Sequence, residues 1–249
     1  MKGTRNIISG CRHQCSYCWA RDRAEQLRDH AARYKDGFVP CFNKAELGKN
    51  YGKDKTWFIG DMGDSWGRWV PANRILDMLD DAKRADSSVT ILFLTKNSLR
   101  YYEFFPLFQP NFVAGFTLET NRVYGPEISR ASSVEERYIA MRDLEYPRKF
   151  VSIEPIMDFD PDVFVGWLAE IAPIRVSVGY DNHNKGLVEP PLEKTVDLID
   201  VLKSFMQVDI KDTLFVTLMP AMKERLGIVE EEPSCEHTKK TRKQSVLKV

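Results

Sequence analysis

The stretch V-T-I-L-F-L-T at residues 89–95 is apolar on both of its faces. A strand with this pattern is typical of a parallel sheet that is covered by helices. Short β-branched or aromatic runs recur on either side of it, and amphipathic stretches separate them. The predicted strands are residues 5–9, 56–60, 89–95, 112–118, 150–153, 175–178 and 214–218. The chain is therefore predicted to alternate strand and helix six or seven times, which indicates a parallel α/β fold.

The predicted helices lie between these strands. Four of them cover residues 19–34, 99–108, 161–171 and 192–206. A further helix begins at Pro71, and another runs from a cap at Ser132 or Ser133 to residue 144. An open doubly wound sheet and a full or partial (βα) barrel both fit this order. In either fold the reactive groups belong at the carboxyl ends of the strands, so polar residues directly after each strand are the candidates for a site.

Composition excludes several classes of protein. The 249 residues are 43% hydrophobic and carry 36 basic and 36 acidic side chains, which disfavours global disorder and a globally basic nucleic-acid binder. No apolar run approaches the roughly 18–20 residues of a membrane span, and the first nine residues are too polar for a secretory signal. We therefore expect a cytoplasmic protein without a membrane partner.

Three of the five cysteines form a C-x3-C-x2-C motif in the sequence C-R-H-Q-C-S-Y-C at residues 11–18. In a reducing compartment such a group binds metal or does chemistry more often than it forms disulfides. Cys11, Cys15 and Cys18 are close enough in sequence to ligate three irons of one iron–sulfur cube and to leave the fourth iron open. A zinc site is the alternative, but it needs a fourth ligand, which only Cys235 or His237 of the C-terminal tail could supply.

The motif, with Tyr17 directly before the third cysteine, closely resembles that of the radical S-adenosylmethionine (SAM) superfamily. The sequences G-D-M-G-D at 60–64, L-T-K at 94–96, a strand ending in Glu119, and F-V-S-I-E-P at 150–155 extend the similarity over about residues 5–220. They resemble the short phage-type radical SAM proteins related to the spore photoproduct lyase group. The resemblance implies an α/β fold, a partial (βα)6 TIM-like barrel with mostly parallel strands. The barrel would span residues 1–220 and a C-terminal extension residues 221–249.

The resemblance also implies the cofactors and their contacts. Cys11, Cys15 and Cys18 would hold a [4Fe-4S] cluster, and S-adenosyl-L-methionine would bind its open iron. The glycine-rich segment of Asp61, Met62, Gly63 and Asp64 departs from the family's G-G-E but would receive the SAM ammonium through Asp64 or Asp61. Taken alone, that segment is a turn rich in Gly and Asp.

Polar residues at later strand ends would complete the SAM site. The implied roles are a carboxylate contact for Lys96, ribose or substrate contacts for Glu119, Ser152 and Glu154, a flat surface for adenine at Gly179, and a substrate contact for Tyr180, Asp181 or His183. A salt bridge inside the barrel is the competing interpretation for Glu119 and Glu154.

The implied activity is reductive cleavage of SAM to a 5′-deoxyadenosyl radical that abstracts hydrogen. The partner would be an electron donor such as flavodoxin or ferredoxin. A nucleic-acid or nucleotide substrate is favoured, with Trp66, Trp69, Tyr101 and Tyr102 as residues that could stack on a base and the basic residues 239–248 as a phosphate-contacting arm. Core packing of those aromatics and a frayed tail are the alternatives. A peptide or small metabolite is the other substrate class, and a non-catalytic iron–sulfur or zinc protein is the alternative to an enzyme.

Overall fold

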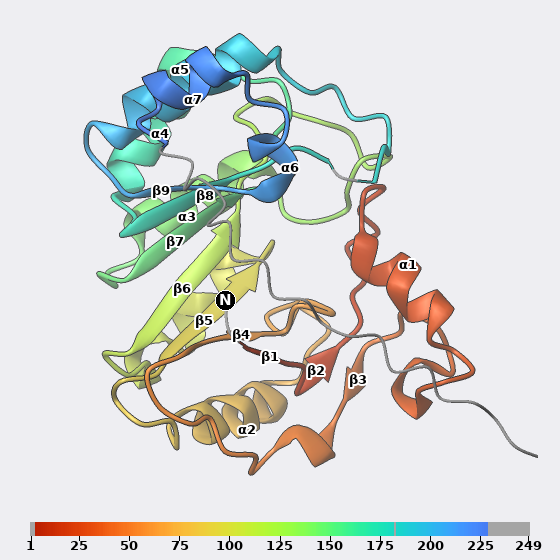
Figure 1. The fold of residues 1–249 in the computed structure, drawn as a ribbon. Helices are drawn as coiled ribbons and strands as arrows, with labels where there is room; N and C mark the ends of the chain where they lie inside the picture. The colour runs from red at the N-terminus through yellow and green to blue at the C-terminus, as the bar shows by residue number, and fades with distance from the viewer. Residues whose placement is uncertain (1–2, 182, 229–249) are drawn as a thin grey trace, which may run out of the picture.

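Seven parallel strands form one sheet in a computed structural model that describes residues 3–181 and 183–228. In spatial order the strands are β1 (Gly3–Arg5), β4 (Thr56–Ile59), β5 (Thr90–Thr95), β6 (Phe112–Thr117), β7 (Lys149–Ile153), β8 (Arg175–Val178) and β9 (Val208–Ile210). Neighbouring strands in the sheet are thus consecutive, apart from a small antiparallel pair of β2 (Ile8–Ser9) and β3 (Cys41–Phe42). The sheet curls into a half-barrel (Figure 1). It stays open because the edge strands β1 and β9 each pair with one neighbour and not with each other.

Helices connect the strands, as a parallel sheet requires. The main ones are α2 (Ala72–Ala82), α3 (Val134–Asp143), α4 (Pro161–Ile171) and α5 (Leu192–Lys203), and they lie against the sheet in Figure 1. Local signals set their starts: Pro71 precedes α2, and Ser133 and Glu136 form a capping box at α3. Helix α1 (Trp19–Gln26) lies apart from these, on the open side of the sheet (Figure 1). The partial barrel predicted from the resemblance is confirmed, with seven strands instead of six.

Two predicted elements near the ends of the sheet are wrong. The strand expected over residues 5–9 is interrupted at residues 6 and 7, so that β1 joins the main sheet and β2 pairs with β3. The strand expected over residues 214–218 is helical from Asp212 to Phe215 (α6), and the last strand is β9. Leu214 and Leu218 are both buried whereas Val216 between them is 76% exposed, so the apolar residues follow a helical period.

The segment after β5 also differs from its prediction. Residues 99–108 were expected to be one helix, and the structure has two 3-10 helices there, η3 (Ser98–Glu103) and η4 (Phe105–Leu107). Pro106 has no backbone N–H and cannot continue an α-helix. The remaining elements are two short 3-10 helices, η1 (Ala32–Tyr34) and η2 (Lys44–Glu46), and a terminal helix α7 (Pro220–Arg225).

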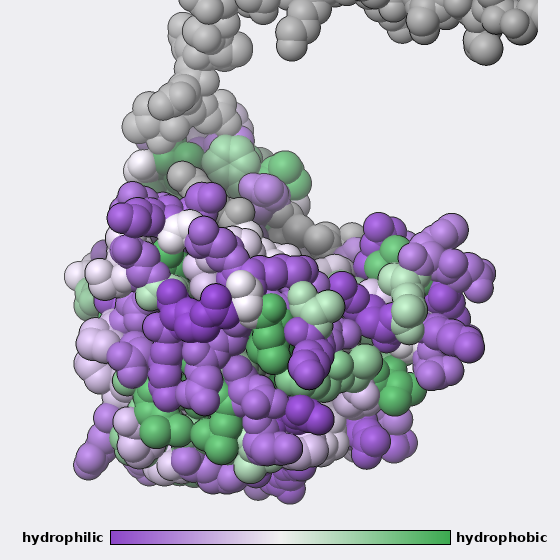
Figure 2. Space-filling view, turned by 90° about the horizontal axis from the view of Figure 1, so that it is seen from below, coloured by the Kyte–Doolittle hydropathy of each residue, from purple (hydrophilic) through white to green (hydrophobic). Residues whose placement is uncertain are grey.

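The face of the molecule seen in Figure 2 is mostly polar. In the view of Figure 2, apolar side chains gather in small patches with hydrophilic side chains between them. No helix among the described residues is long and apolar enough to cross a membrane.

Candidate functional site

A cavity of about 540 Å³ opens at the carboxyl ends of the parallel strands. Its wall combines apolar residues inside the half-barrel, such as Phe58, Leu92 and Phe150, with polar residues from the loops that follow β4, β5, β7 and β8. The cysteine loop and the start of α1 complete the wall. The cavity therefore lies where the strand order predicts a site.

All three cysteines of the motif line this cavity. None of them is in a disulfide; Cys15 is buried, and Cys11 and Cys18 are half-buried. The Cys15 Sγ lies 3.1 Å from the Ser129 Oγ, and the backbone N–H of His13 donates to the Cys11 Sγ at 3.4 Å. Burial raises the pKa of the Cys11 and Cys18 thiols, so an electropositive ligand is needed to hold them as thiolates.

A backbone bridge joins the start of the cysteine loop to the loop after β4. Gly10 pairs in parallel with Gly63, and the Gly10 N–H donates to the Met62 carbonyl at 2.8 Å. A Cβ on Gly63 would lie 2.6 Å from the Gly10 oxygen, and a Cβ on Gly10, which has φ +80°, would lie 2.3 Å from the Val39 oxygen. Only glycine fits at these two crossings, although the sequence pattern singled out Gly63 alone.

The segment of residues 125–131, after β6, holds the other side of the cysteine loop. The Ser16 N–H donates to the Ile128 carbonyl at 2.8 Å, and the Arg130 N–H donates to the His13 carbonyl at 2.7 Å. This segment also carries Ser129, the neighbour of Cys15. Sequence reasoning missed it, because nothing in its composition distinguishes it from an ordinary loop.

His13 is a structural tie between two loops. Its Nε2 lies 2.8 Å from the Asp64 Oδ2, both side chains are buried, and its ring meets the edge of Trp69 at 4.8 Å between centroids. The sequence alone gives no role to this residue. The structure instead links the cysteine loop through His13 to the carboxylate that follows β4.

The two candidate acids after β4 differ in their surroundings. Asp64 is buried and accepts hydrogen bonds from the side chains of His13 and Thr95 and from the backbone N–H groups of Trp66 and Lys96. Burial opposes its ionisation, but these donors, His13 first, lower its pKa. Asp61 also lines the cavity, its Oδ1 has no partner among the described residues, and burial raises its pKa. Asp61 is thus the carboxylate with a free oxygen.

Glu119 lies below the cavity in a network of ionic hydrogen bonds. It is fully buried and pairs with the Lys96 ammonium, with the Tyr17 hydroxyl and, at 2.8 Å, with the Arg137 guanidinium. Burial would raise its pKa, but Arg137 and Lys96 outweigh burial and hold the pKa well below its ordinary range. Glu119 does not line the cavity. It forms ion pairs with Lys96 and Arg137 inside the barrel, as in the competing interpretation of this residue as part of a salt bridge.

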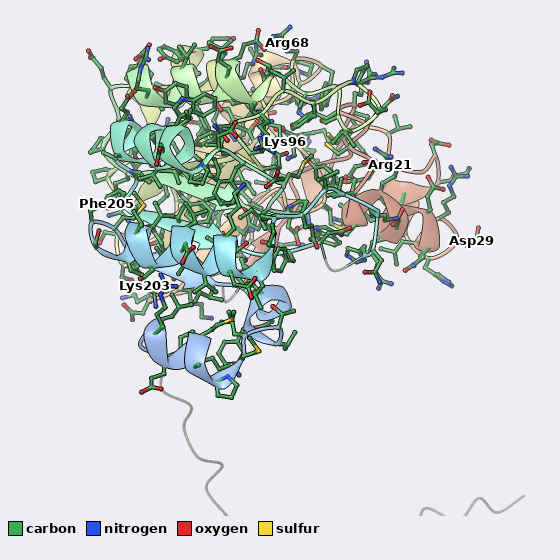
Figure 3. The ribbon with its side chains drawn as sticks, turned by 90° about the horizontal axis from the view of Figure 1, so that it is seen from above. Arg21, Asp29, Arg68, Lys96, Lys203 and Phe205 are labelled. Atoms are coloured by element: carbon green, nitrogen blue, oxygen red, sulfur yellow. The ribbon has the colours of Figure 1, made fainter. Side chains whose placement is uncertain are left out.

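Lys96 lines the cavity and is half-buried; its label falls near the middle of the view in Figure 3. Its ammonium donates to the Glu119 carboxylate and, at 2.8 Å, to the Tyr17 hydroxyl. A lysine has three N–H donors, so one remains for a ligand in the cavity.

The other predicted residues fall into two groups. Ser152, Glu154, Tyr180, Asp181 and His183 line the cavity with Gly63. The Glu154 Oε2 faces the Lys211 Nζ at 3.5 Å, and the Tyr180 hydroxyl is bonded to the Thr195 Oγ1 at 2.8 Å. Gly179 and Met62 do not line the cavity: Gly179 is tied by its backbone to Ile153 and Ile156, and Met62 packs against residues of α1.

Two of the four expected base-stacking aromatics are core residues, whereas Trp69 is half-buried and Tyr102 is exposed. Trp66 and Tyr101 are fully buried, and Trp66 packs edge-on against Phe93, Tyr101, Phe104 and Phe108. These two cannot stack on a base, which corrects that expectation. The exposed aromatic at the cavity is Trp19, directly after Cys18. The basic residues 239–248 and Cys235 lie outside the described residues.

The donor chemistry of the cavity wall fits an iron–sulfur cube, because three free thiols on one wall are what three of its irons require. Among the described residues, no group of three or more His, Cys, Asp or Glu side chains is placed to hold a metal ion. That finding concerns several ligands on one ion, whereas the thiolates of a cube each bind a different iron.

Comparisons with known proteins agree on the fold. No protein-family model and no curated protein matches the chain. Among solved structures it is similar to SuiB of Streptococcus suis bound to S-adenosylmethionine, with TM-score 0.54 and 11% sequence identity, covering 88% of this chain and 52% of SuiB. The chain therefore shares the half-barrel fold of this structure.

Two further structures belong with this comparison. SuiB bound to its precursor peptide SuiA gives TM-score 0.53 at 11% identity, over 90% of this chain and 54% of that one. Spore photoproduct lyase with bound AdoMet and a dinucleoside spore photoproduct is similar at 11% identity, covering 92% of this chain and 62% of the lyase. Its TM-score of 0.46 is too low to carry an argument. The chain spans about half the length of SuiB, and at this identity the likeness concerns the half-barrel alone.

Proposed function

We propose that this protein is a radical SAM enzyme, with a [4Fe-4S] cluster on Cys11, Cys15 and Cys18 and S-adenosyl-L-methionine beside it. The observation that carries the proposal is the position of three free thiols on the wall of one cavity, at the carboxyl ends of a half-barrel. That half-barrel has the fold of a protein whose structure contains S-adenosylmethionine. When bound, the cluster and SAM would supply reductive cleavage of the sulfonium to a 5′-deoxyadenosyl radical.

The surroundings of each side chain suggest its part in binding SAM. Asp61, with its unpartnered oxygen at the cavity, would accept hydrogen bonds from the SAM ammonium. Lys96 would donate its third N–H to the SAM carboxylate while Glu119 and Tyr17 hold the other two. Asp64 would not contact SAM, because its oxygens are already occupied by the cysteine loop and by β5. Ser152 and Glu154 remain for a ribose or a substrate.

The apolar interior of the half-barrel would protect the reaction. Phe58, Leu92, Leu94 and Phe150 line the cavity next to the polar groups. Such a wall excludes water from a reactive species. We propose an electron donor such as flavodoxin or ferredoxin as the partner, and a nucleotide or nucleic acid as the substrate.

The proposal is tested by anaerobic reconstitution with iron and sulfide, followed by counting both per chain. We expect about four irons in the wild type and a loss of most of that iron when Cys15 is replaced (Cys15→Ala), since each thiolate ligates a separate iron. Cys41→Ala is the matched control, because Cys41 is half-buried, belongs to β3 and does not line the cavity.

Two outcomes would contradict the proposal. One zinc per chain, with no iron, would support a non-catalytic zinc protein. Equal loss of iron in the Cys41→Ala and Cys15→Ala variants would show that the ligands are assigned wrongly.

A further inference from the structure

A second hollow, of about 340 Å³, lies on the other side of the cysteine loop from the site cavity. We call it the arginine cleft. Three loops contribute an exposed arginine to it: Arg12 from the cysteine loop, Arg68 from the loop after β4 and Arg130 from the segment after β6. The rest of its wall consists of His13, Trp69, Asn97, Ala131, Ser132 and Glu136.

The positive charge of the arginine cleft is not neutralised from within. No ion pair and no side-chain hydrogen bond of Arg12, Arg68 or Arg130 occurs in the described part of the chain, whereas most other arginines there have an acidic partner. The acid in the wall, Glu136, accepts the Ser133 N–H at 2.9 Å as part of the α3 capping box. Three guanidinium groups with free donors therefore surround one hollow.

A further donor in the wall is without a partner. The Trp69 Nε1 is buried and makes no hydrogen bond with the described residues. A buried N–H that is left unpaired is unfavourable, and a ligand acceptor that reached it would relieve this cost. Together with the arginines it makes a cleft rich in donors, which suits a ligand rich in acceptor oxygens.

The arginine cleft and the site cavity adjoin each other. His13 of the cysteine loop lines both of them. Both are built from loops at the same, carboxyl end of the strands, with Lys96 in the cavity and its neighbour Asn97 in the cleft. In the view of Figure 3, Arg68 lies at the edge of the molecule and Lys96 nearer its middle; Arg68 is exposed and Lys96 is half-buried. One extended molecule can thus present a group to each of them.

We propose that the arginine cleft binds a phosphate group of the substrate. This inference rests on the proposed function and specifies its substrate as a nucleotide or a nucleic-acid strand, whose phosphate lies in the cleft while the reacting part enters the cavity. Planar guanidinium groups bind phosphate oxygens through paired, charge-assisted hydrogen bonds. A hollow surrounded by three of them fits a compact oxyanion better than it fits the flat face of a partner protein.

The test measures binding of a fluorescein-labelled dT12 strand to the full chain by anisotropy, at several salt concentrations. Arg68→Gln and Arg130→Gln should each weaken binding by about tenfold, and the double variant by about a hundredfold if the two contacts are independent. Each should also reduce the steepness of the log–log salt dependence by about 0.7, the value per phosphate contact on a single strand. Arg23→Gln is the matched control, because Arg23 is exposed on α1 and contacts only Gln26, at 3.1 Å.

Competition separates the two sources of phosphate. Displacement of dT12 by thymidine monophosphate at a similar concentration supports a nucleotide, and displacement only by longer strands supports a nucleic acid. Unchanged affinity and salt slope in the double variant would overturn the proposal. The proposal would also be overturned if the wild type bound neither dT12 nor thymidine monophosphate, and instead bound an acidic carrier protein through Arg68 and Arg130. Iron is counted separately, so failure to form a cluster counts against the proposed function alone.

Discussion

The two acids that follow β4 have opposite surroundings and therefore different expected roles. Asp64 accepts hydrogen bonds from four groups, and its removal would leave the buried His13 side chain and two backbone N–H groups without an acceptor. Asp61 lines the cavity and has one buried oxygen that no described residue bonds. The sequence predicts an acid in this loop. It cannot distinguish the two, because their partners lie far away in the chain, such as His13, which is 51 positions from Asp64.

We predict that Asp64→Ala lowers the free energy of unfolding by about 3 kcal/mol, since several buried donors lose their acceptor. Asp61→Asn should leave stability nearly unchanged and weaken SAM binding about tenfold or more, as a charge-assisted hydrogen bond is lost. Urea unfolding and SAM titration of the reconstituted protein measure the two effects. The reverse pattern, with stability lost in Asp61→Asn and affinity lost in a stable Asp64→Ala, would contradict these roles.

A second residue-scale prediction concerns the buried charge of Glu119. Its pKa is lowered in the folded protein, against the effect of burial, by Arg137 and Lys96. The stabilisation that it contributes is therefore complete above the unfolded pKa of about 4.3, and it is lost as the pH falls through the folded-state pKa. Glu119→Gln leaves two buried cations without their partner and should cost about 3–5 kcal/mol at pH 7.

The measurement is the difference in unfolding free energy between wild type and Glu119→Gln as the pH is lowered from 7 to about 3.5. We expect the difference to persist down to about pH 4.3 and to shrink below it. A difference that stays constant over the whole range would mean that Glu119 is not held as a carboxylate.

At the scale of elements, the contact between the cysteine loop and the loop after β4 sets the shape of the site. Gly63 meets Gly10 so closely that a Cβ would lie 2.6 Å and 2.7 Å from backbone atoms of Gly10. Gly63→Ala must therefore push the two loops apart. We predict a loss of about 2 kcal/mol or more in stability, together with reduced iron loading on reconstitution.

Gly166→Ala is the matched control for Gly63→Ala. Gly166 lies within α4, and a Cβ there would have nothing within 4 Å. Alanine is the better helix former, so this variant should be more stable by up to about 1 kcal/mol and should load iron normally. Equal behaviour of the two variants would show that the Gly10–Gly63 crossing does not constrain the site.

Elements with strong local signals could be predicted from the sequence, and those held by tertiary contacts could not. Pro71, Pro161 and the Ser133–Glu136 capping box mark helix starts, and the long apolar strand β5 has an unmistakable pattern. Strand β9 has three half-buried residues, one of them acidic, and exists because β8 offers it a free edge. The helix α6 was mistaken for a strand because its apolar run is too short to reveal its period.

The site follows the same division. The spacing of the cysteines predicts that their thiols act together, because the three are only seven residues apart and share one loop. The sequence does not predict three parts of the site: the segment of residues 125–131, Trp19 and the arginine cleft. Each depends on loops that the half-barrel brings together from distant parts of the chain.

On the scale of the whole molecule, the open sheet explains why one end of the fold gathers so much chemistry. Seven parallel strands end at the same edge, with α1 on the open side of the sheet (Figure 1). Their loops, the cysteine loop and the start of α1 line a cavity whose wall includes thiols, acids and a lysine. The arrangement of the whole chain, more than any single residue, supports a SAM-dependent reaction at that end.

The measurement that tests this account most directly is SAM cleavage by the reconstituted and reduced wild-type protein. We predict that adding SAM changes the electron paramagnetic resonance spectrum of the reduced cluster, and that 5′-deoxyadenosine and methionine appear in equal amounts. Neither change should occur in Cys15→Ala. A protein that holds four irons per chain but shows no spectral change with SAM and forms no 5′-deoxyadenosine would contradict the central claim.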